Sequence, residues 1–394
     1  MSTRPCWVEI STRALEDNYR FLANLAGASI DLLAVVKANA YGHSLSVCAP
    51  ALVRGGASWL GVTSVEEGIE ARRLCPDTRI LVIGGVFPGQ GNDIIRNKLA
   101  AVVWESRQFD ELESAARSTG VRSISVHLEI DTGMSRQGAD LHSLVPLLAR
   151  FRRDFPLRLE GVMTHLFAAD EADERVTEEQ LARMDEALNL INSARVHPGV
   201  LNVGNSAALL AGQANAIAEL ASRHYMKALM RPGLALYGLV PEFDPPFVSA
   251  EPITLGHARR GLRPVLAWKS QVVSVRSVPA GAVVGYNGTF LATEPMRLAL
   301  VAAGYADGLD RRLSNKGRVI IRGRCAPLAG RISMDLTLAD VTTIEDVSVG
   351  DEVILLGSDG TCAISALDHA RAAGTITHDI LCSIGSRVPR RYLE

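Results

Sequence analysis

The sequence predicts an α/β protein in which a (β/α)8 barrel of the TIM type is followed by a mainly β domain. Three observations support this fold class: eight short apolar runs in the first two-thirds of the chain, amphipathic stretches between them, and a change of texture near Pro241. The chain has 394 residues, of which 47% are hydrophobic and 21% charged. This is ordinary globular composition, and the length favours two domains.

The eight apolar runs are rich in β-branched residues and are short. Continuous apolar runs of this length are typical of strands that are buried on both faces, as in a parallel sheet. The runs cover residues 32–36, 59–63, 80–84, 100–104, 124–130, 159–164, 200–204 and 229–237.

The stretches between these runs predict helices. Residues 64–74 combine apolar positions at helical spacing with Ser64 and Glu67, which have the spacing of a capping box. Residues 177–193 repeat the apolar spacing. A doubly wound open sheet is the alternative, but the first predicted strand is not followed by a glycine-rich phosphate-binding turn. We therefore expect the barrel.

The second domain is predicted to begin near residue 241, which gives domains at 1–240 and 241–394. Residues 241–246 contain three prolines and predict a linker. The first few residues of the chain are also candidates for pairing with the β domain. Strands are predicted at 265–278, 297–303, 318–322, 332–341 and 352–356, and a helix only at 365–373.

Charge and cysteine content exclude several classes of protein. Lys and Arg (41) nearly balance Asp and Glu (43), so no nucleic-acid-binding surface is expected. The sequence contains no apolar run of about 18 residues, which argues against a membrane span, and its first residues do not resemble a signal peptide. The six cysteines lack the spacing of a zinc site, so no metal is expected. A cytoplasmic protein with reduced thiols is the prediction.

Lys37 ends the first predicted strand, where a barrel carries its reactive groups. An ammonium group beside a buried strand is poorly solvated, which lowers the pKa of a lysine. The side chain either extends to solvent at the rim of the barrel or serves as a nucleophilic amine that bonds to an aldehyde. Its position alone leaves both interpretations open.

Ordered motifs along nearly the whole chain resemble the alanine racemase family. They lie at residues 34–43 (AVVKANAYGH), 127–136 (HLEIDTGMSR), 163–165 (MTH), 205–208 (NSAA), 230–238, 284–289, 304–308, 330–335 and 387–390. The resemblance implies a barrel followed by a β domain, which agrees with the architecture predicted from the apolar runs. It also implies the cofactor pyridoxal 5'-phosphate (PLP) and a homodimer with composite active sites.

The resemblance implies two catalytic bases. Lys37 would hold PLP covalently and act on one face of the substrate, and Tyr286 of the partner subunit would act on the other. Racemisation needs two groups because a proton removed from one face must be replaced on the opposite face. His165 and Arg231 would form a hydrogen-bonded chain to the tyrosine. The implied reaction is the interconversion of L- and D-alanine, either to supply D-alanine for peptidoglycan or to break it down.

Arg231 is matched to the residue that faces the pyridine nitrogen of PLP. A guanidinium group donates hydrogen bonds and does not give up its proton, so the nitrogen would stay unprotonated. A weaker electron sink of this kind limits side reactions such as transamination.

The remaining implied contacts concern the cofactor phosphate, the substrate and the route of access. Arg136 is matched to a contact of both the cofactor and the substrate carboxylate, Met334 of the partner subunit to a second carboxylate contact, and Tyr305 and Asp170 to the corridor through which substrate enters. The implied phosphate contacts are Tyr41, Asn205, Ser206, Gly233, Leu234 and His378.

The sequence departs from the family pattern at a few positions. Glu129 stands where many relatives have a carbamylated lysine that orients the arginine matched by Arg136, and we expect Glu129 to supply the anionic oxygen to that arginine directly. His378 replaces a common tyrosine, which predicts a roomier or more polar pocket that also admits serine. Phe290 replaces a common tyrosine and Asn287 a common glycine, both beside the turn that carries Tyr286.

The sequence also bears on three other interpretations. A PLP-binding barrel protein without racemase activity would end after the first domain, whereas this chain has a β domain and Tyr286. A basic-amino-acid decarboxylase would place a carboxylate, and not Arg231, at the pyridine nitrogen. A racemase of broad specificity is distinguished only by assay.

Overall fold

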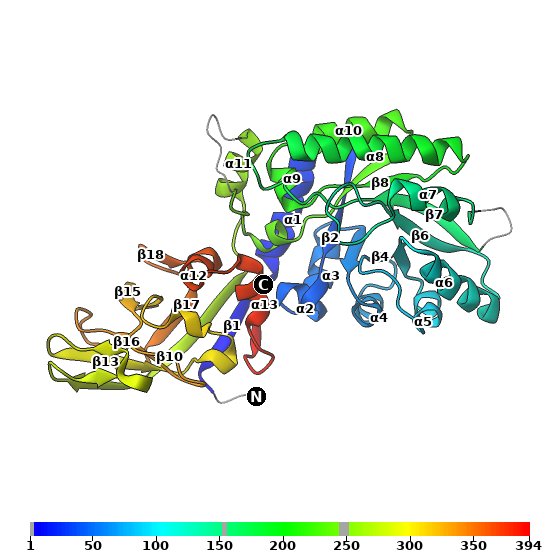
Figure 1. Cartoon of the computed structure of the whole chain (residues 1–394). Helices are drawn as coiled ribbons and strands as arrows, with labels where there is room; N and C mark the ends of the chain where they lie inside the picture. Colours follow the sequence, from blue (N-terminus) through cyan, green and yellow to red (C-terminus); the bar gives the residue numbers. More distant parts are fainter. Residues whose placement is uncertain (1–3, 152–155, 244–251) are drawn as a thin grey trace. The chain divides into compact units, whose positions relative to one another are not determined.

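The computed structural model describes residues 4–151, 156–243 and 252–394. The chain divides into two compact units (Figure 1). The barrel unit comprises Ala14–Ala40 and Leu45–Arg263, and the β unit comprises Met1–Arg13, Tyr41–Ser44 and Pro264–Glu394. The β unit is therefore assembled from three separate segments of sequence.

The barrel unit contains eight parallel strands that close into a barrel, which confirms the predicted fold. Each strand pairs with its sequence neighbours, and the first closes on the last through pairs such as Leu32 with Met230. The strands are β2 (Ile30–Val35), β3 (Trp59–Val62), β4 (Arg79–Val82), β5 (Ala100–Val103), β6 (Ile124–Glu129), β7 (Leu157–Met163), β8 (Val200–Asn202) and β9 (Lys227–Met230).

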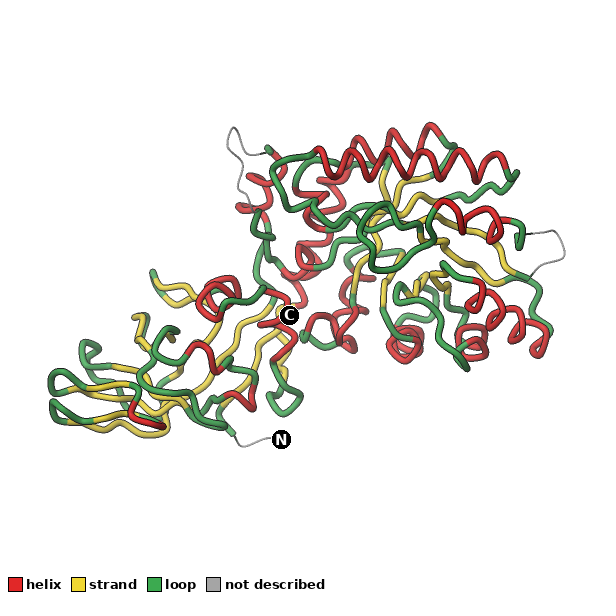
Figure 2. Tube along the Cα trace, viewed as in Figure 1, coloured by secondary structure: helices red, strands yellow, loops and turns green. Residues whose placement is uncertain are grey.

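Helices follow the strands and lie outside them, as the tube in Figure 2 shows. In the capping pair predicted at the start of α4, Ser64 accepts a hydrogen bond from Glu67 N, but the Glu67 carboxylate turns instead to Thr63 N and Asn39 N. The helices are α1 (Thr12–Ala26), α2 (Lys37–Tyr41), α3 (Leu45–Arg54), α4 (Val65–Leu74), α5 (Gly91–Arg96), α6 (Ser106–Thr119), α7 (Leu141–Leu148), α8 (Arg175–Ser193), α9 (Ser206–Leu210), α10 (Ala214–Arg223) and α11 (Ile253–Gly261).

The last predicted strand of the barrel is shorter than expected. Strand β9 ends at Met230, and the apolar run continues as the 3-10 helix η1 (Leu234–Tyr237). Pro232 has no N–H with which to extend the ladder, although its carbonyl still accepts a hydrogen bond from Val35 N at 3.0 Å. The prediction of a strand over 231–237 was therefore wrong.

The β unit is built on a nine-stranded sheet around the long strand β10. Strand β1, near the start of the chain, pairs antiparallel with β10 and parallel with β19. The strands of this sheet are β1 (Cys6–Ser11), β10 (Leu266–Val278), β13 (Met296–Val301), β14 (Arg318–Ile321), β15 (Arg324–Pro327), β16 (Thr337–Asp340), β17 (Glu352–Asp359), β18 (Cys362–Ile364) and β19 (Arg390–Leu393). A small hairpin pairs β11 (Val283–Val284) with β12 (Phe290–Leu291).

Some local predictions for the second half of the chain were wrong. The strand expected at 332–341 covers only Thr337–Asp340, because the residues before it form a turn. Two helices were not predicted, α11 in the barrel unit and α13 (Thr377–Ser383) in the β unit, beside the expected α12 (Ala366–Ala373). Residues 244–246 of the predicted linker lie outside the described residues. Within the described ranges, no helix has the length and apolar character that crossing a membrane requires.

Candidate active site

The carboxyl ends of the barrel strands gather most of the predicted site residues of the barrel unit. Lys37 follows β2, His165 follows β7 and Arg231 follows β9. Because all eight strands are parallel in one closed barrel, these ends share one face. The predicted residues therefore lie at the end of the barrel where enzymes of this fold place their chemistry.

Lys37 begins an unusual turn. The next four residues, Ala38 to Tyr41, have φ between 52° and 55°, a left-handed conformation that costs about 1–2 kcal/mol for each residue with a Cβ. The Glu67 carboxylate accepts a hydrogen bond from Asn39 N at 3.2 Å, and the Asn39 side chain accepts one from Leu45 N at 2.7 Å. These contacts hold the strained turn that carries the half-buried Lys37.

Arg231 is buried, with 5% of its surface exposed, and most of its donors are used within the barrel. Nη1 donates to the Asn202 backbone oxygen and to Asn202 Oδ1, both at 2.7 Å. Nη2 donates to Thr164 O at 2.8 Å and contacts His165 Nδ1 at 3.3 Å. Burial lowers the pKa of Arg231 to about 10, and the nearby Glu129 opposes this change. The guanidinium group therefore remains a cation at neutral pH.

His165 is held as a neutral imidazole beside Arg231. Burial lowers its pKa to about 3, and the charges of Arg231, Arg136 and Lys37 act in the same direction. Arg231 can only donate, so Nδ1 of His165 accepts and its proton resides on Nε2. The structure thus brings together two of the predicted site residues, with a defined N–H on the far side of the imidazole.

The predicted phosphate contacts after β8 and β9 are joined to one another. Ser206 Oγ accepts hydrogen bonds from Gly233 N at 2.9 Å and Ala235 N at 3.2 Å, and a hydroxyl that accepts two amides still has one proton to donate. The Asn205 side chain caps α9 by accepting from Ala208 N at 3.0 Å. Leu234 begins η1 directly after Gly233.

Tyr41 and His378 lie together within the β unit. Their ring centroids are 5.6 Å apart and the rings are inclined at 44°. Burial raises the pKa of the Tyr41 phenol, while His378 is exposed on α13. The residue that departs from the family pattern therefore contacts a predicted phosphate ligand directly.

Two further predicted residues are exposed in loops of the barrel unit. Arg136 follows β6, and Asp170 lies between β7 and α8. Glu129, at the end of β6, is 2% exposed, and its carboxylate accepts a 2.6 Å hydrogen bond from Gln137 Nε2. Burial raises the pKa of Glu129, an effect opposed by Gln137 and by the charges of Arg231 and Arg136.

Three predicted residues of the β unit lie on exposed turns. Tyr286, Tyr305 and Met334 are 65%, 41% and 53% exposed. The turns of the last two are joined by hydrogen bonds from Tyr305 N to Ser333 O at 3.0 Å and from Ala306 N to Met334 O at 2.9 Å. A Cβ on Gly304 would come within 2.4 Å of the Met334 carbonyl oxygen, so this close approach requires glycine.

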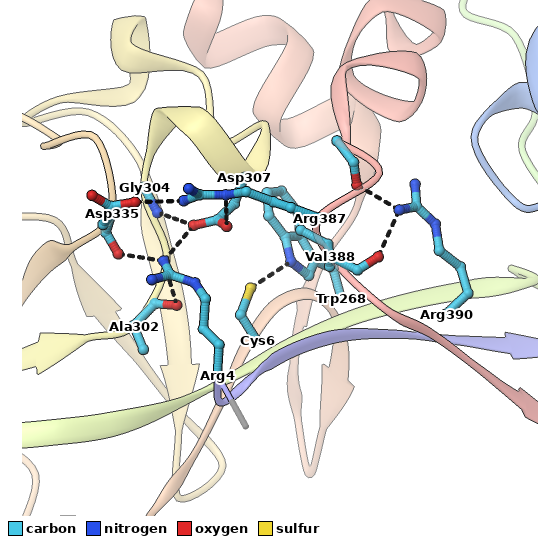
Figure 3. Close-up of polar contacts among 11 residues, drawn as sticks. Arg4, Cys6, Trp268, Ala302, Gly304, Asp307, Asp335, Arg387, Val388 and Arg390 are labelled. Atoms are coloured by element: carbon cyan, nitrogen blue, oxygen red, sulfur yellow. Dashed lines mark hydrogen bonds and ion pairs between the residues drawn. The ribbon is translucent and has the colours of Figure 1, made fainter. Parts of the chain in front are cut away.

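A buried carboxylate that the sequence analysis did not single out holds these turns in place. Asp307 Oδ2 accepts hydrogen bonds from Gly304 N at 2.9 Å and Arg4 Nη2 at 2.7 Å, and Oδ1 accepts from Arg387 Nε at 2.7 Å (Figure 3). Arg387 also reaches Asp335 at 2.7 Å, and both carboxylates raise its pKa. The motifs at 304–308 and 387–390 contain these residues, but nothing in the sequence indicated that they meet.

Comparisons with known proteins cover almost the whole chain. Residues 10–241 match the family model "Alanine racemase, N-terminal domain", and residues 265–392 match "Alanine racemase, C-terminal domain". The alanine racemase of Halothermothrix orenii is 36% identical over 390 residues, which cover 99% of this chain and 97% of that protein. That of Syntrophobacter fumaroxidans is 38% identical over 379 residues, covering 96% and 95%.

Solved structures agree with the sequence comparisons. The alanine racemase of Streptomyces lavendulae superposes with a TM-score of 0.89 at 34% identity and covers 100% of this chain and 98% of that one. The alanine racemase of Bartonella henselae, solved with covalently bound pyridoxal phosphate, has a TM-score of 0.83 at 27% identity over 99% of both chains. The chain therefore belongs to the alanine racemase family, whose members are PLP-dependent isomerases.

Proposed function

We propose that this protein interconverts L- and D-alanine with PLP, and that Lys37 and the partner subunit's Tyr286 are the two bases. One observation carries the proposal above all: Lys37, His165 and Arg231 lie on the same face of one closed barrel, and the last two are in direct contact. The similarity to alanine racemases over 99% of the chain supports the choice of alanine as substrate.

The residues on this face fit PLP. A half-buried amine at Lys37 suits the aldehyde, and a buried cation at Arg231 suits the ring nitrogen. The Ser206 hydroxyl proton and the Leu234 amide offer donors of the kind that bind phosphate, and the Gly233 amide, which donates to Ser206 Oγ in this structure, would join them by leaving that bond. When bound, the cofactor delocalises the negative charge that develops at the substrate Cα.

The protein's own groups then move the proton. Lys37 Nζ removes or delivers it on one face, and Oη of the partner subunit's Tyr286 acts on the other. An amine near pKa 10 and a phenol near pKa 10 are weak bases at neutral pH, so nearby cations are needed to favour the free amine and the phenolate. Neutral His165, whose Nε2–H faces away from Arg231, would transmit that effect to the partner subunit's Tyr286.

The other predicted residues would bind the substrate and the cofactor phosphate or line the route by which substrate enters. Arg136 and the backbone amide of the partner subunit's Met334 would hold the substrate carboxylate. Tyr305 and Asp170 would line the route of access, and the exposure of Tyr286, Tyr305 and Met334 in one chain suits residues that complete a partner's site. Tyr41, Asn205 and His378 would complete the phosphate site.

The proposal extends to the context of the reaction. It assigns the cofactor to a barrel domain at 1–240 and the second base to a β domain at 241–394, in a cytoplasmic homodimer. The D-alanine formed would serve peptidoglycan synthesis, and breakdown of D-alanine is the alternative.

Serine is a second candidate substrate because of His378. The imidazole beside Tyr41 is shorter and more polar than the phenol of many relatives. The decisive comparison is the ratio of serine to alanine turnover in the wild type and in His378→Tyr. We expect this ratio to fall about tenfold in the variant, since pocket changes of this size alter selectivity by that order. Negligible serine turnover by the wild type would restrict the proposal to alanine.

The main test is an assay that resolves D- and L-amino acids, applied to alanine, serine and several larger amino acids. Borohydride reduction of the holoprotein, followed by peptide mapping, should place the cofactor on Lys37, and Lys37→Ala should abolish turnover. A label on another lysine, or a holoprotein that leaves every enantiopure amino acid unchanged, would contradict the proposal.

A further inference from the structure

A column of buried polar side chains runs through the barrel from Arg231 toward the opposite end of the strands. It consists of Arg231 after β9, Asn202 on β8, His127 on β6 and Glu160 on β7, with exposures of 5%, 0%, 0% and 7%. Polar groups buried to this degree in an apolar barrel are expensive unless they are paired. The contacts that these four side chains make with one another therefore have to offset the cost of burying them.

The hydrogen bonds of the column have a fixed direction. Arg231 only donates, so Asn202 must present Oδ1 to it, at 2.7 Å. The amide nitrogen of Asn202 then faces His127 Nδ1 at 3.4 Å and donates to it. An imidazole that accepts at Nδ1 carries its proton on Nε2 when it is neutral. The position of one guanidinium group thus fixes the amide orientation and the imidazole tautomer.

The far end of the column is a carboxylate. His127 Nε2 lies 4.0 Å from Glu160 Oε2, and in the described part of the chain this nitrogen has no hydrogen-bond partner. The distance exceeds that of a hydrogen bond, so the N–H dipole interacts with the carboxylate electrostatically. Burial and the charges of Arg79, Arg231 and Arg158 hold the pKa of His127 at about 3. The imidazole therefore stays neutral at working pH and does not carry protons along the column.

The barrel leaves space for His127 in one orientation. A Cβ on Gly161 would lie 2.6 Å from Cε1 of the imidazole, so the ring lies directly on this glycine. The ring of Trp59 meets the imidazole edge-on, with centroids 5.7 Å apart, and the Arg79 guanidinium lies 3.8 Å above the Trp59 ring. Close packing on both sides sets the plane of the imidazole, and the hydrogen bond with Asn202 selects which ring nitrogen faces that amide.

Glu160 is remote from the face that carries Lys37. It lines a cavity of about 680 Å³ with Trp59, Arg79 and Arg158, residues that lie at or near the amino ends of their strands, whereas Lys37 follows the carboxyl end of β2. Glu160 Oε1 is paired with Arg79 and with Arg158 Nη2, the latter at 3.2 Å. The column therefore links a cluster of ions at one end of the barrel to the candidate active site at the other.

We propose that Asn202, His127 and Glu160 are positioning residues that hold Arg231 in the orientation in which it faces the cofactor ring. The dipoles of the column run in one direction from Arg231 to the Glu160 carboxylate, and in this proposal that alignment fixes the orientation of the guanidinium group. The inference rests on the proposed function insofar as that function places the ring nitrogen of PLP at Arg231. The column itself is independent of any reaction.

The first test measures the affinity of the apoprotein for PLP by absorbance titration. Glu160→Gln should weaken binding about 2- to 30-fold, the range expected when a residue acts through a network. Glu160→Asp, which keeps the charge, should recover part of the loss. The matched control is Asp185→Asn: Asp185 also pairs with a histidine, His224, at 2.6 Å, and neither residue belongs to the column, so the affinity should not change.

A double-mutant cycle separates positioning from general destabilisation. If Glu160 acts through Arg231, the effects of Glu160→Gln and Arg231→Lys on PLP affinity and on kcat should be less than additive. Additive effects, or a Glu160→Gln affinity equal to that of the control, would overturn the proposal.

The second test needs neither activity nor cofactor. Solid-state NMR of protein labelled with 15N-histidine should show His127 as the neutral Nε2–H tautomer, assigned by its loss in His127→Gln. Asn202→Leu should release this preference; if that variant does not fold, the wild-type spectrum decides alone. An Nδ1–H tautomer would overturn the column, whereas a missing racemase activity with the Nε2–H tautomer present would overturn only the proposed function.

Discussion

Glu129 Oε2 accepts a 2.6 Å hydrogen bond from Gln137 Nε2, and the same buried carboxylate is the chief counter-charge of Arg231. In the described part of the chain, Glu129 forms no hydrogen bond with Arg136, the partner expected from the sequence. Its charge nevertheless acts on both arginines, since each lowers the pKa of the carboxyl against the effect of burial. Glu129 therefore interacts electrostatically with both arginines.

The first prediction concerns the origin of that charge. Glu129→Gln keeps the shape and an acceptor for Gln137 but removes the charge, so we expect kcat/KM for alanine to fall about tenfold, the usual order for a lost hydrogen-bonded charge. Glu129→Lys restores the residue of many relatives, and its activity should rise with added bicarbonate, while the wild type should not respond. A fully active Glu129→Gln enzyme would dismiss the role.

The second prediction concerns the stability of the protein in mild acid. His127 and His165 have pKa values near 3 and His369 near 4, because each is buried. An unfolded chain binds protons at these histidines below about pH 6.5, whereas the folded chain does not. The free energy of unfolding should therefore be highest above pH 6.5. It should decrease as the pH falls below this value, by up to about 1.4 kcal/mol per pH unit for each histidine.

Urea unfolding at several pH values between 7.5 and 5 measures this slope, in a window above the range where carboxylates with ordinary pKa values titrate. His369→Asn should reduce the slope by the share of one histidine, because it removes one group that titrates in the unfolded chain only. His369 suits this test since it lies in the β unit and outside the candidate site. A free energy of unfolding that is constant across this window would show that the imidazoles titrate normally in the folded protein.

The third prediction concerns Asp307, whose carboxylate is buried between Arg4 and Arg387. Asp307→Asn keeps the volume but removes the buried negative charge that Arg4 and Arg387 share, and this loss, with partly exposed arginines, should lower the free energy of unfolding by about 2 kcal/mol. Urea unfolding measures the change. The control is Asp173→Asn, an exposed partner of Arg175, which should leave the unfolding midpoint in place. Equal urea-unfolding midpoints for the two variants would contradict a structural role for Asp307.

The contrast between the strands and Asp307 shows what the sequence can predict. Buried parallel strands are continuous apolar runs, so the barrel was predicted from residues that are adjacent in sequence. The same signal failed at 231–237, because apolar residues continued after Pro232 had ended the ladder. Asp307 could not be recognised because its partner Arg4 is 303 positions away, and an Asp before Gly308 is equally typical of an ordinary turn.

In the candidate site, too, some features could be predicted from local sequence and others depend on the folded structure. Lys37 was recognisable at a strand end, and the motifs supplied Arg231 and His165 by resemblance. The support of Arg231 by Asn202 and of the Lys37 turn by Glu67 depends on neighbouring strands and loops meeting in space. No local sequence pattern predicts such contacts between residues that are distant in the chain.

The last prediction concerns the composite site. If Lys37 of one subunit works with the partner subunit's Tyr286, then Lys37→Ala and Tyr286→Phe should each be nearly inactive alone. After unfolding and refolding of an equal mixture, half of the dimers combine one chain of each kind. One of the two sites in such a dimer has both variant residues, and the other has neither. The mixture should therefore recover about a quarter of the wild-type activity, as two-fold symmetry requires. A site built within one chain would recover none, because every chain would still carry one inactive base; a mixture of Lys37→Ala with His165→Ala, which both alter barrel residues, should likewise stay inactive.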